Sequence, residues 1–298
     1  MSCVLQNNAY GKSRVRLTKV IRQPQRHELK ELSVDIQLEG DFAPSYTAGD
    51  NSKVVATDSM KNTVYVLAAE HPLNDIEGFA VHLAQHFTQK YAQVKSATVH
   101  IQEDLWNRIV SNGSEHKHSF VSAGDEKRVT TVTSAQGALE IESGIENLLV
   151  LKTTDSEFWG FVRDEYTTLP EVRDRIFATS VAAYWLYGQQ QPDFNEIYAR
   201  VRQLILDVFA KHHSLAVQQT LHEMGKEALA ACPHISEISI TMPNQHRIPF
   251  DLTRFNMENK NEIFVPTDEP YGLISAQIVR EAKQMSSIGA DKAQAKIR

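Results

Sequence analysis

The polar and aromatic side chains that could act on a small molecule lie in short runs, at predicted ends of strands and helices. In residues 55–63, VATDSMKNT, an apolar stretch ends in polar residues that can begin a helix. Asp58 or Ser59 can cap the free backbone amides of such a helix. Thr57 would then lie at a strand-to-helix junction, where its hydroxyl can face a ligand. By itself this run indicates only the beginning of a helix.

An aromatic run and an arginine in the second half of the chain could hold a flat anion. Phe158 begins the run FWGF, and its ring can stack on a planar heterocycle in an offset parallel contact. Arg175 directly follows an aspartate and carries a guanidinium fork, which suits paired acceptor atoms better than lysine does. The alternatives are core packing for the ring and a solvated helix face for the arginine.

Two further runs place polar groups near the ends of elements. Val217 and Gln218 fall in the first turn of a predicted helix after a possible cap, Ser214. Free amides there attract an anion, and the Gln218 carboxamide offers both a donor and an acceptor. Asn244 and His246 follow a strand and a proline, so we expect them in a loop, where functional groups are common. A histidine can pass protons near neutral pH, although many loop histidines are only solvated.

In their order and separations, these runs closely resemble the urate oxidase (uricase) family, whose members oxidise urate with dioxygen and without a cofactor. The likeness extends from about residue 8 to residue 280. It is carried by Tyr10-Gly11-Lys12, residues 55–63, Phe158-Trp159-Gly160-Phe161, Arg173-Asp174-Arg175, Val217-Gln218 and Pro243-Asn244-Gln245-His246. Each run is weak alone, and the ordered set is specific.

The resemblance implies a role for each matching residue. The catalytic proton relay would consist of Lys12, Thr57 and His246. Substrate contacts would come from Thr57, Asp58, Phe158, Arg175, Val217, Gln218 and Asn244, and dioxygen or water would lie near Thr57 and Asn244. Trp159 and Phe161 would remain in the core, and Arg173 would be solvated. In the family these groups come from two neighbouring subunits, so the resemblance also implies a homotetramer with shared active sites for urate and dioxygen.

Composition and charge limit the other possibilities. The 298 residues are 42% hydrophobic and 23% charged, as in ordinary globular proteins, and a net charge of −6 argues against a general nucleic-acid binder. Cys3 and Cys232 form no CxxC pattern, which favours a reducing compartment over a disulfide framework. No stretch approaches the length needed to span a bilayer, and the ending AKIR is no peroxisomal signal. We therefore expect a cytoplasmic protein without a membrane partner.

Closely spaced histidines invite a test for a metal site. His82 and His86 would share one helix face, but Leu83 stands where a zinc protease would carry its glutamate. No cysteine or acidic cluster completes a ligand set beside them. We therefore expect no metal site, and the resemblance implies that no cofactor is needed.

The elements that must position these residues follow a similar order in each half of the chain. Alternating apolar residues predict strands, and three- and four-residue spacing predicts helices. The predicted strands cover residues 15–21, 32–38, 97–102, 128–133, 138–142, 148–153, 176–187 and 235–242, and the predicted helices cover 76–91, 194–211 and 215–231. Residues 111–127, rich in Ser, Gly, Glu and His, are expected to form a loop.

An echo between ATDS at 56–59 and TTDS at 153–156 favours two tandem strand-strand-helix-helix-strand-strand units. We expect an antiparallel α+β fold, divided into domains at 1–135 and 136–283 with an exposed tail at 284–298. By resemblance these are two T-fold (tunnelling-fold) domains, with paired helices on one face of each sheet, whose sheets close into a barrel only on oligomerisation.

Two other functions remain open at this point. One is a metal-dependent pterin or purine hydrolase of the same fold, which would require zinc. The other is a purine-binding module without turnover, and the retention of Lys12, Thr57 and His246 argues against it.

Overall fold

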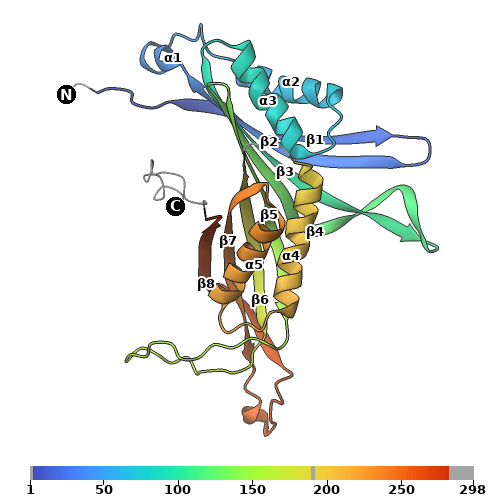
Figure 1. Cartoon of the computed structure of the whole chain (residues 1–298), viewed down its shortest axis with the longest axis vertical. Coiled ribbons are helices and arrows are strands. Elements are labelled where there is room, and N and C mark those ends of the chain that lie inside the picture. Colours follow the sequence, from blue (N-terminus) through green and yellow to red (C-terminus); the bar gives the residue numbers. More distant parts are fainter. Residues whose placement is uncertain (1–2, 189–191, 282–298) are drawn as a thin grey trace.

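The computed structural model describes residues 3–188 and 192–281, which form one antiparallel sheet with helices packed against it (Figure 1). Within these residues the elements are β1 (Ala9–Arg22), β2 (His27–Gly40), α1 (Ala43–Ala48), α2 (Thr57–Glu70), α3 (Ile76–Lys90), β3 (Val94–Ser111), β4 (Ser114–Ala135), β5 (Ala138–Lys152), β6 (Phe177–Tyr187), α4 (Phe194–Lys211), α5 (Val217–Ala231), β7 (Ile235–Pro249), the 3-10 helix η1 (Thr253–Phe255) and β8 (Phe264–Val279). The strands occur in the sheet in their order along the chain. The predicted antiparallel α+β class is confirmed.

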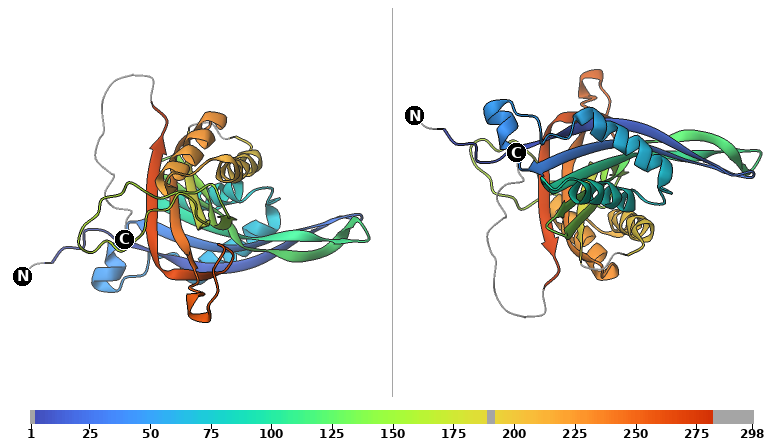
Figure 2. Two further views of the ribbon diagram at one scale, coloured as in Figure 1. Left: turned by 90° about the horizontal axis from the view of Figure 1, so that it is seen from below. Right: turned by 90° about the horizontal axis from the view of Figure 1, so that it is seen from above.

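Strand β2 illustrates how the sequence sets the two faces of the sheet. Leu32, Val34 and Ile36 are at most 2% exposed, and the residues between them are more exposed. Because successive strand side chains point to opposite faces, one face of the sheet forms the core. The helices α2 to α5 pack against the strands on that face (Figure 2).

The two halves of the chain contain the same succession of two strands, a pair of helices and two strands, with α1 added in the first half and η1 in the second. A lysine of the first strand in each half donates to a carbonyl near the end of the first paired helix. Lys19 Nζ lies 2.7 Å from the Ala68 oxygen, and Lys152 Nζ lies 2.6 Å from the His212 oxygen. Such a contact neutralises part of the negative end of the helix dipole. The sheet continues from one half to the other, and the division into two domains stays a prediction.

Residues 111–127, expected to form a loop, belong almost entirely to β3 and β4, so that prediction was wrong. Asn112 and Gly113, with φ of 52° and 80°, form a two-residue turn between these strands, as in a type I′ hairpin. The end of this hairpin projects away from the helices (Figure 1). Its side chains are exposed or half-buried on both faces, so the alternation that marks a strand is lost.

Strand β5 is continuous where two strands were expected, at 138–142 and 148–153. The pairing of β5 with β6 shifts register between Ile145 and Leu148, and Asn147 has φ of 57°. A bulge of this kind interrupts the alternating pattern without ending the strand. The tail expected at 284–298 lies outside the described residues.

No helix within residues 3–188 and 192–281 is long and apolar enough to cross a membrane. Two of the paired helices, α3 and α4, begin at side-chain caps that the sequence supplies. Asp75 accepts a hydrogen bond from the Gly78 amide at the start of α3, and Asp193 accepts one from the Glu196 amide at the start of α4.

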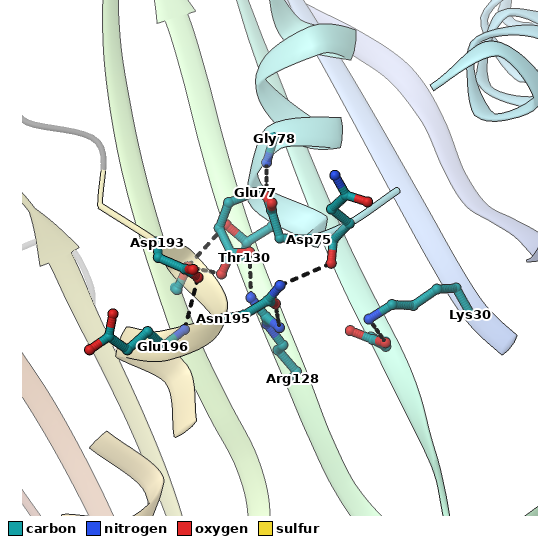
Figure 3. Close-up of polar contacts among 12 residues, drawn as sticks. Lys30, Asp75, Glu77, Gly78, Arg128, Thr130, Asp193, Asn195 and Glu196 are labelled. Atoms are coloured by element: carbon teal, nitrogen blue, oxygen red, sulfur yellow. Dashed lines mark hydrogen bonds and ion pairs between the residues drawn. The ribbon is translucent and has the colours of Figure 1, made fainter. Parts of the chain in front are cut away.

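A buried ion pair joins elements of both halves (Figure 3). Glu77 of α3 is 0% exposed, and its two carboxylate oxygens accept from Arg128 of β4 at 2.7 Å and from Ser143 of β5 at 2.6 Å. Arg128 also donates to Asn195 of α4 at 2.6 Å. Burial raises the pKa of Glu77, while Arg128 and Ser143 act in the opposite direction. The cluster holds one helix of each pair to the strands β4 and β5.

Candidate active site

The first group of predicted site residues lies where β1 begins, beside the segment that leads into α2. The Tyr10 hydroxyl accepts a hydrogen bond from the Val55 amide at 2.8 Å and donates to the Val55 carbonyl at 3.2 Å. These bonds hold the segment before α2 against β1. Lys12, which is half-buried on β1, and Thr57, which is exposed as the first residue of α2, therefore belong to the same region.

The beginning of α2 differs from the prediction. Ala56 is the N-cap, and no side chain of the described residues caps this helix. Asp58 instead accepts from Lys61 Nζ at 2.5 Å and from Asn62 Nδ2 at 3.1 Å. The Lys61 ammonium, with a smaller contribution from Lys12, lowers the pKa of Asp58. The backbone before Ala56 is irregular, not a strand, and the first amides of α2 stay available to a ligand.

The second group lies between β5 and β6 and at the beginning of α5. Phe158 exchanges two backbone hydrogen bonds with Val172, of 2.9 and 3.0 Å. The rings of Phe158 and Phe161 lie nearly parallel, 14° apart, with 4.9 Å between their centroids. The guanidinium carbon of Arg175 lies 5.2 Å from the Phe158 centroid. The fold thus brings the predicted aromatic face and the predicted planar cation together.

Arg175 is half-buried and has a donor without a partner. Its Nε is buried and makes no hydrogen bond within the described part of the chain. Burial lowers the pKa of the guanidinium, which is nevertheless a cation at neutral pH because arginine titrates far above it. A ligand with acceptor atoms on its rim would satisfy both the charge and the free donor.

The neighbours of Phe158 differ from their predicted environments. Trp159 and Phe161 were expected in the core, but Trp159 is 44% exposed and Phe161 is half-buried. Arg173 is exposed, as expected, but it lies outside any helix, with its guanidinium carbon 3.5 Å from the Trp159 centroid. The segment between β5 and β6 extends away from the sheet (Figure 1), so its aromatic rings pack on one another and on arginines.

The beginning of α5 carries Val217 and Gln218. Val217 is 4% exposed, and Gln218 is exposed. Ala216 is the N-cap, and Ser214, the expected cap, uses its hydroxyl elsewhere. That hydroxyl donates to the Ala216 carbonyl at 3.1 Å and accepts from Thr220 at 2.8 Å. The first amides of α5 therefore remain available to an anion.

Asn244 and His246 lie in strand β7, and the prediction of a loop was wrong. Asn244 pairs with Thr179 of β6 and with Gly272 of β8, and these two pairings extend β7 beyond its predicted end. The β7–β8 register shifts between Asn244 and His246, and Nδ2 of the amide lies 3.5 Å from Nδ1 of the ring. Because β6 begins two residues after Arg175, this pairing brings both side chains toward the Arg175 end of β6.

Sequence reasoning missed two charged side chains beside Phe158. The Nε2 atom of His213 lies 2.7 Å from one oxygen of Glu157, and the other oxygen accepts from Trp159 Nε1 at 2.6 Å. Adjacency is the signal that could have found them. Glu157 directly precedes Phe158, and His213 directly precedes Ser214 at the approach to α5.

Histidines and acidic residues do not gather as metal ligands in the part of the chain that is described. No group of three or more His, Cys, Asp or Glu able to hold a metal ion occurs there. His82 and His86 lie on α3, where the ring of His82 packs against that of His71 with 5.4 Å between centroids.

The two groups of predicted site residues lie far apart in one copy of the chain. Helix α2 lies at the upper end of the molecule in Figure 1, and the segment between β5 and β6 extends from the lower end. Within one copy, Lys12, Thr57 and Asp58 lie in one region, and Phe158 and Arg175 lie in another. One copy therefore does not bring the complete predicted set together.

An antiparallel sheet in two similar halves, each with a pair of helices, defines a T-fold enzyme. The family model described as Uricase matches residues 8–133 and 141–275. The chain belongs to the uricase family.

Individual relatives agree over nearly their whole lengths. The uricase of Arthrobacter globiformis is 46% identical over 281 residues, which cover 94% of this chain and 91% of the relative. The uricase of Dictyostelium discoideum is 39% identical, with 94% and 98% covered. Among solved structures, the Arthrobacter globiformis uricase superposes with a TM-score of 0.90 at 45% identity, covering 96% of this chain and 98% of that one. The urate oxidase of Bacillus sp. TB-90 superposes with a TM-score of 0.76 at 26% identity, covering 92% and 100%.

Proposed function

We propose that this protein is a urate oxidase that converts urate, dioxygen and water to 5-hydroxyisourate and hydrogen peroxide without a cofactor. The observation that carries the proposal is the pair of Phe158 and Arg175, an aromatic face and a planar cation 5.2 Å apart. Urate is a flat anion with acceptor atoms around its rim, so it suits both groups. Membership of the uricase family supports the same substrate.

In this proposal the urate ring stacks on the ring of Phe158. Arg175 binds one edge of the ring through its fork, including the Nε that is otherwise without a partner in the described chain. Gln218 meets the opposite edge through its carboxamide, and Val217 contributes its backbone amide at the start of α5.

The chemistry would be performed by the relay and the substrate together. Lys12 accepts one proton from urate through the Thr57 hydroxyl and His246 accepts a second, which leaves an electron-rich ring. Both protons are returned from these side chains when peroxide forms. Two electrons and two protons pass from urate to dioxygen held near Asn244 and Thr57, forming hydrogen peroxide, and water adds to the oxidised ring at the same place. The backbone amide of Asp58 contacts the substrate. The protein contributes position and preorganised charge, since the substrate itself supplies the electrons.

The same proposal requires two copies of the chain for one site. One copy would supply Lys12, Thr57 and Asp58, and its neighbour the remaining groups, because the two sets lie at opposite ends of a single copy (Figure 1). We propose a homotetramer of chains with two T-fold domains each, 1–135 and 136–283, whose sheets close into a barrel. The edge strands β1 and β8 support this assembly, since edge strands can pair with another copy.

The proposed compartment is the cytoplasm. Cys3 and Cys232 are free thiols, as is usual where the surroundings are reducing. The net charge of −6 supports a small-molecule substrate over a nucleic acid.

The test is to mix metal-stripped protein with urate under air and to follow urate loss and peroxide together. The proposal expects equal amounts of both, with no response to added zinc. Activity that appears only with zinc and without peroxide would favour a hydrolase instead. Tight urate binding with zero turnover would favour a binding module, and either result would overturn the proposal.

A further inference from the structure

His213 lies between the two segments that carry the proposed substrate contacts of the second half. Residues 155–157 run parallel to the approach to α5 through a bridge between Ser156 and Ser214. The Glu157 amide donates to the Ser214 carbonyl at 2.7 Å, and the Ser214 amide donates to the Asp155 carbonyl at 2.9 Å. Phe158 directly follows residues 155–157, and helix α5 begins at Val217, three residues after Ser214.

The partly exposed side chain of His213 contacts both acidic residues of the first segment, Asp155 and Glu157. Its Nε2 lies 2.7 Å from Glu157 Oε1, and its Nδ1 lies 3.5 Å from Asp155 Oδ1. The Glu157 side chain is only 15% exposed, whereas that of His213 is 50% exposed. An imidazolium placed between two carboxylates can bind both at once. The side chain therefore connects the segment before Phe158 to the segment before α5.

We propose that His213 is a positioning residue of the candidate active site, whose imidazolium binds Glu157 and Asp155 and so holds the Phe158 ring at a fixed place relative to the start of α5. The inference rests on the proposed function, since it concerns binding of the same flat anion. His213 itself does not contact the substrate. It acts through Glu157, whose second oxygen holds the Trp159 indole at 2.6 Å.

The surrounding charges favour the protonated ring. The hydrogen bond to Glu157 raises the pKa of His213, and the contact with Asp155 adds a smaller effect in the same direction. The hydrogen bond from His213 lowers the pKa of Glu157. The other charged groups that face this contact are Arg173, 3.7 Å from Glu157 Oε2, and Lys152, whose pKa is lowered by burial and, to a smaller extent, raised by the charge of Asp155. The folded-state pKa of His213 lies above the ordinary value, so the contact is fully present from about pH 6.5 down to the acid range in which Glu157 takes up a proton. It is lost as the pH rises through the raised pKa.

The test compares His213→Gln, which removes the charge, with His213→Arg, which keeps it at every pH. His222→Gln is the matched control, because His222 lies on α5, is exposed, and pairs only weakly with its neighbour Glu223 at 3.7 Å. Near pH 6 we expect His213→Gln to raise KM for urate about five- to tenfold with kcat within about twofold. The arginine variant should stay near the wild-type KM, and the control should not change.

A pH series separates positioning from a general loss of stability. The ratio of KM in the wild type to KM in His213→Arg should rise with pH, because only the histidine loses its proton. Hydrogen exchange in the protein without urate should become faster at the amides of Glu157 and Ser214 in His213→Gln. The control variant should leave both amides protected.

Three outcomes would decide the matter. Unchanged KM and unchanged exchange in His213→Gln, with an active wild type, would overturn the role of His213 alone. If His213→Gln lowers kcat, raises KM and also unfolds the whole protein, the role is overturned as well, because a general loss of structure is not positioning. A wild type that does not oxidise urate would overturn the proposed function, and the inference with it, even if exchange at Glu157 responds.

Discussion

Replacing Glu77 by glutamine should lower the free energy of unfolding by about 3 kcal/mol. The change leaves the Arg128 guanidinium buried without a countercharge, because the two side chains are 0% and 5% exposed and 2.7 Å apart. Removing one partner of a buried ion pair typically costs about 3–5 kcal/mol. Asn195 and the ring of Tyr198 would still contact Arg128, which places the expected loss at the lower end of that range.

Urea unfolding at one fixed protein concentration measures this loss, since the stability of an oligomer depends on concentration. Glu223→Gln is the matched control, because Glu223 and Lys226 form a 2.9 Å pair with side chains 30% and 56% exposed, where ion pairs contribute little. The double variant Glu77→Leu with Arg128→Met should recover most of the loss, since both charges are removed. A loss below about 1 kcal/mol in Glu77→Gln would refute the reasoning, because the guanidinium would then have another way to be solvated.

Three further predictions concern the candidate site. Lys12→Met should lower kcat for urate oxidation at least about 100-fold in a folded protein, and turnover near that of the wild type would remove Lys12 from the relay. Arg175→Lys should raise KM by roughly tenfold because the planar fork is lost; steady-state kinetics with an unchanged KM would take Arg175 out of the pocket. Gly11→Ala should lower the melting temperature and abolish turnover, because the new Cβ would lie 1.8 Å from the Ile36 carbonyl oxygen and separate β1 from β2. A thermal unfolding curve that matches the wild type would contradict that last expectation.

Several elements could be predicted because their own side chains report burial. The predicted helix at 194–211 coincides with α4, Phe194–Lys211, since its apolar residues recur on the face that packs on the sheet. The strand predicted at 32–38 lies within β2 for the same reason, with period two. The family was predicted from the order of its short motifs and is confirmed.

Other features could not be predicted from local pattern. The end of the β3–β4 hairpin has exposed or half-buried side chains on both faces, so its strands show no alternation of apolar and polar residues. His246 lies in a strand because β8 extends β7 beyond the apolar residues of its first part. Trp159 is exposed because its segment leaves the sheet, and its ring packs on Arg173. The neighbouring residues in the sequence do not reveal whether such a ring lies in the core or at the surface.

What the sequence determined by itself is therefore the set of chemical groups, the alternation of strands and helices, and the family. Only the tertiary structure decided which groups meet. It placed Phe158 beside Arg175 and connected Glu157 to His213, and it separated both from Lys12 and Thr57 at the other end of the sheet. The physical reason is that periodicity reports only whether a face is buried, whereas the meeting of distant residues depends on strand register and on the paths of long connections.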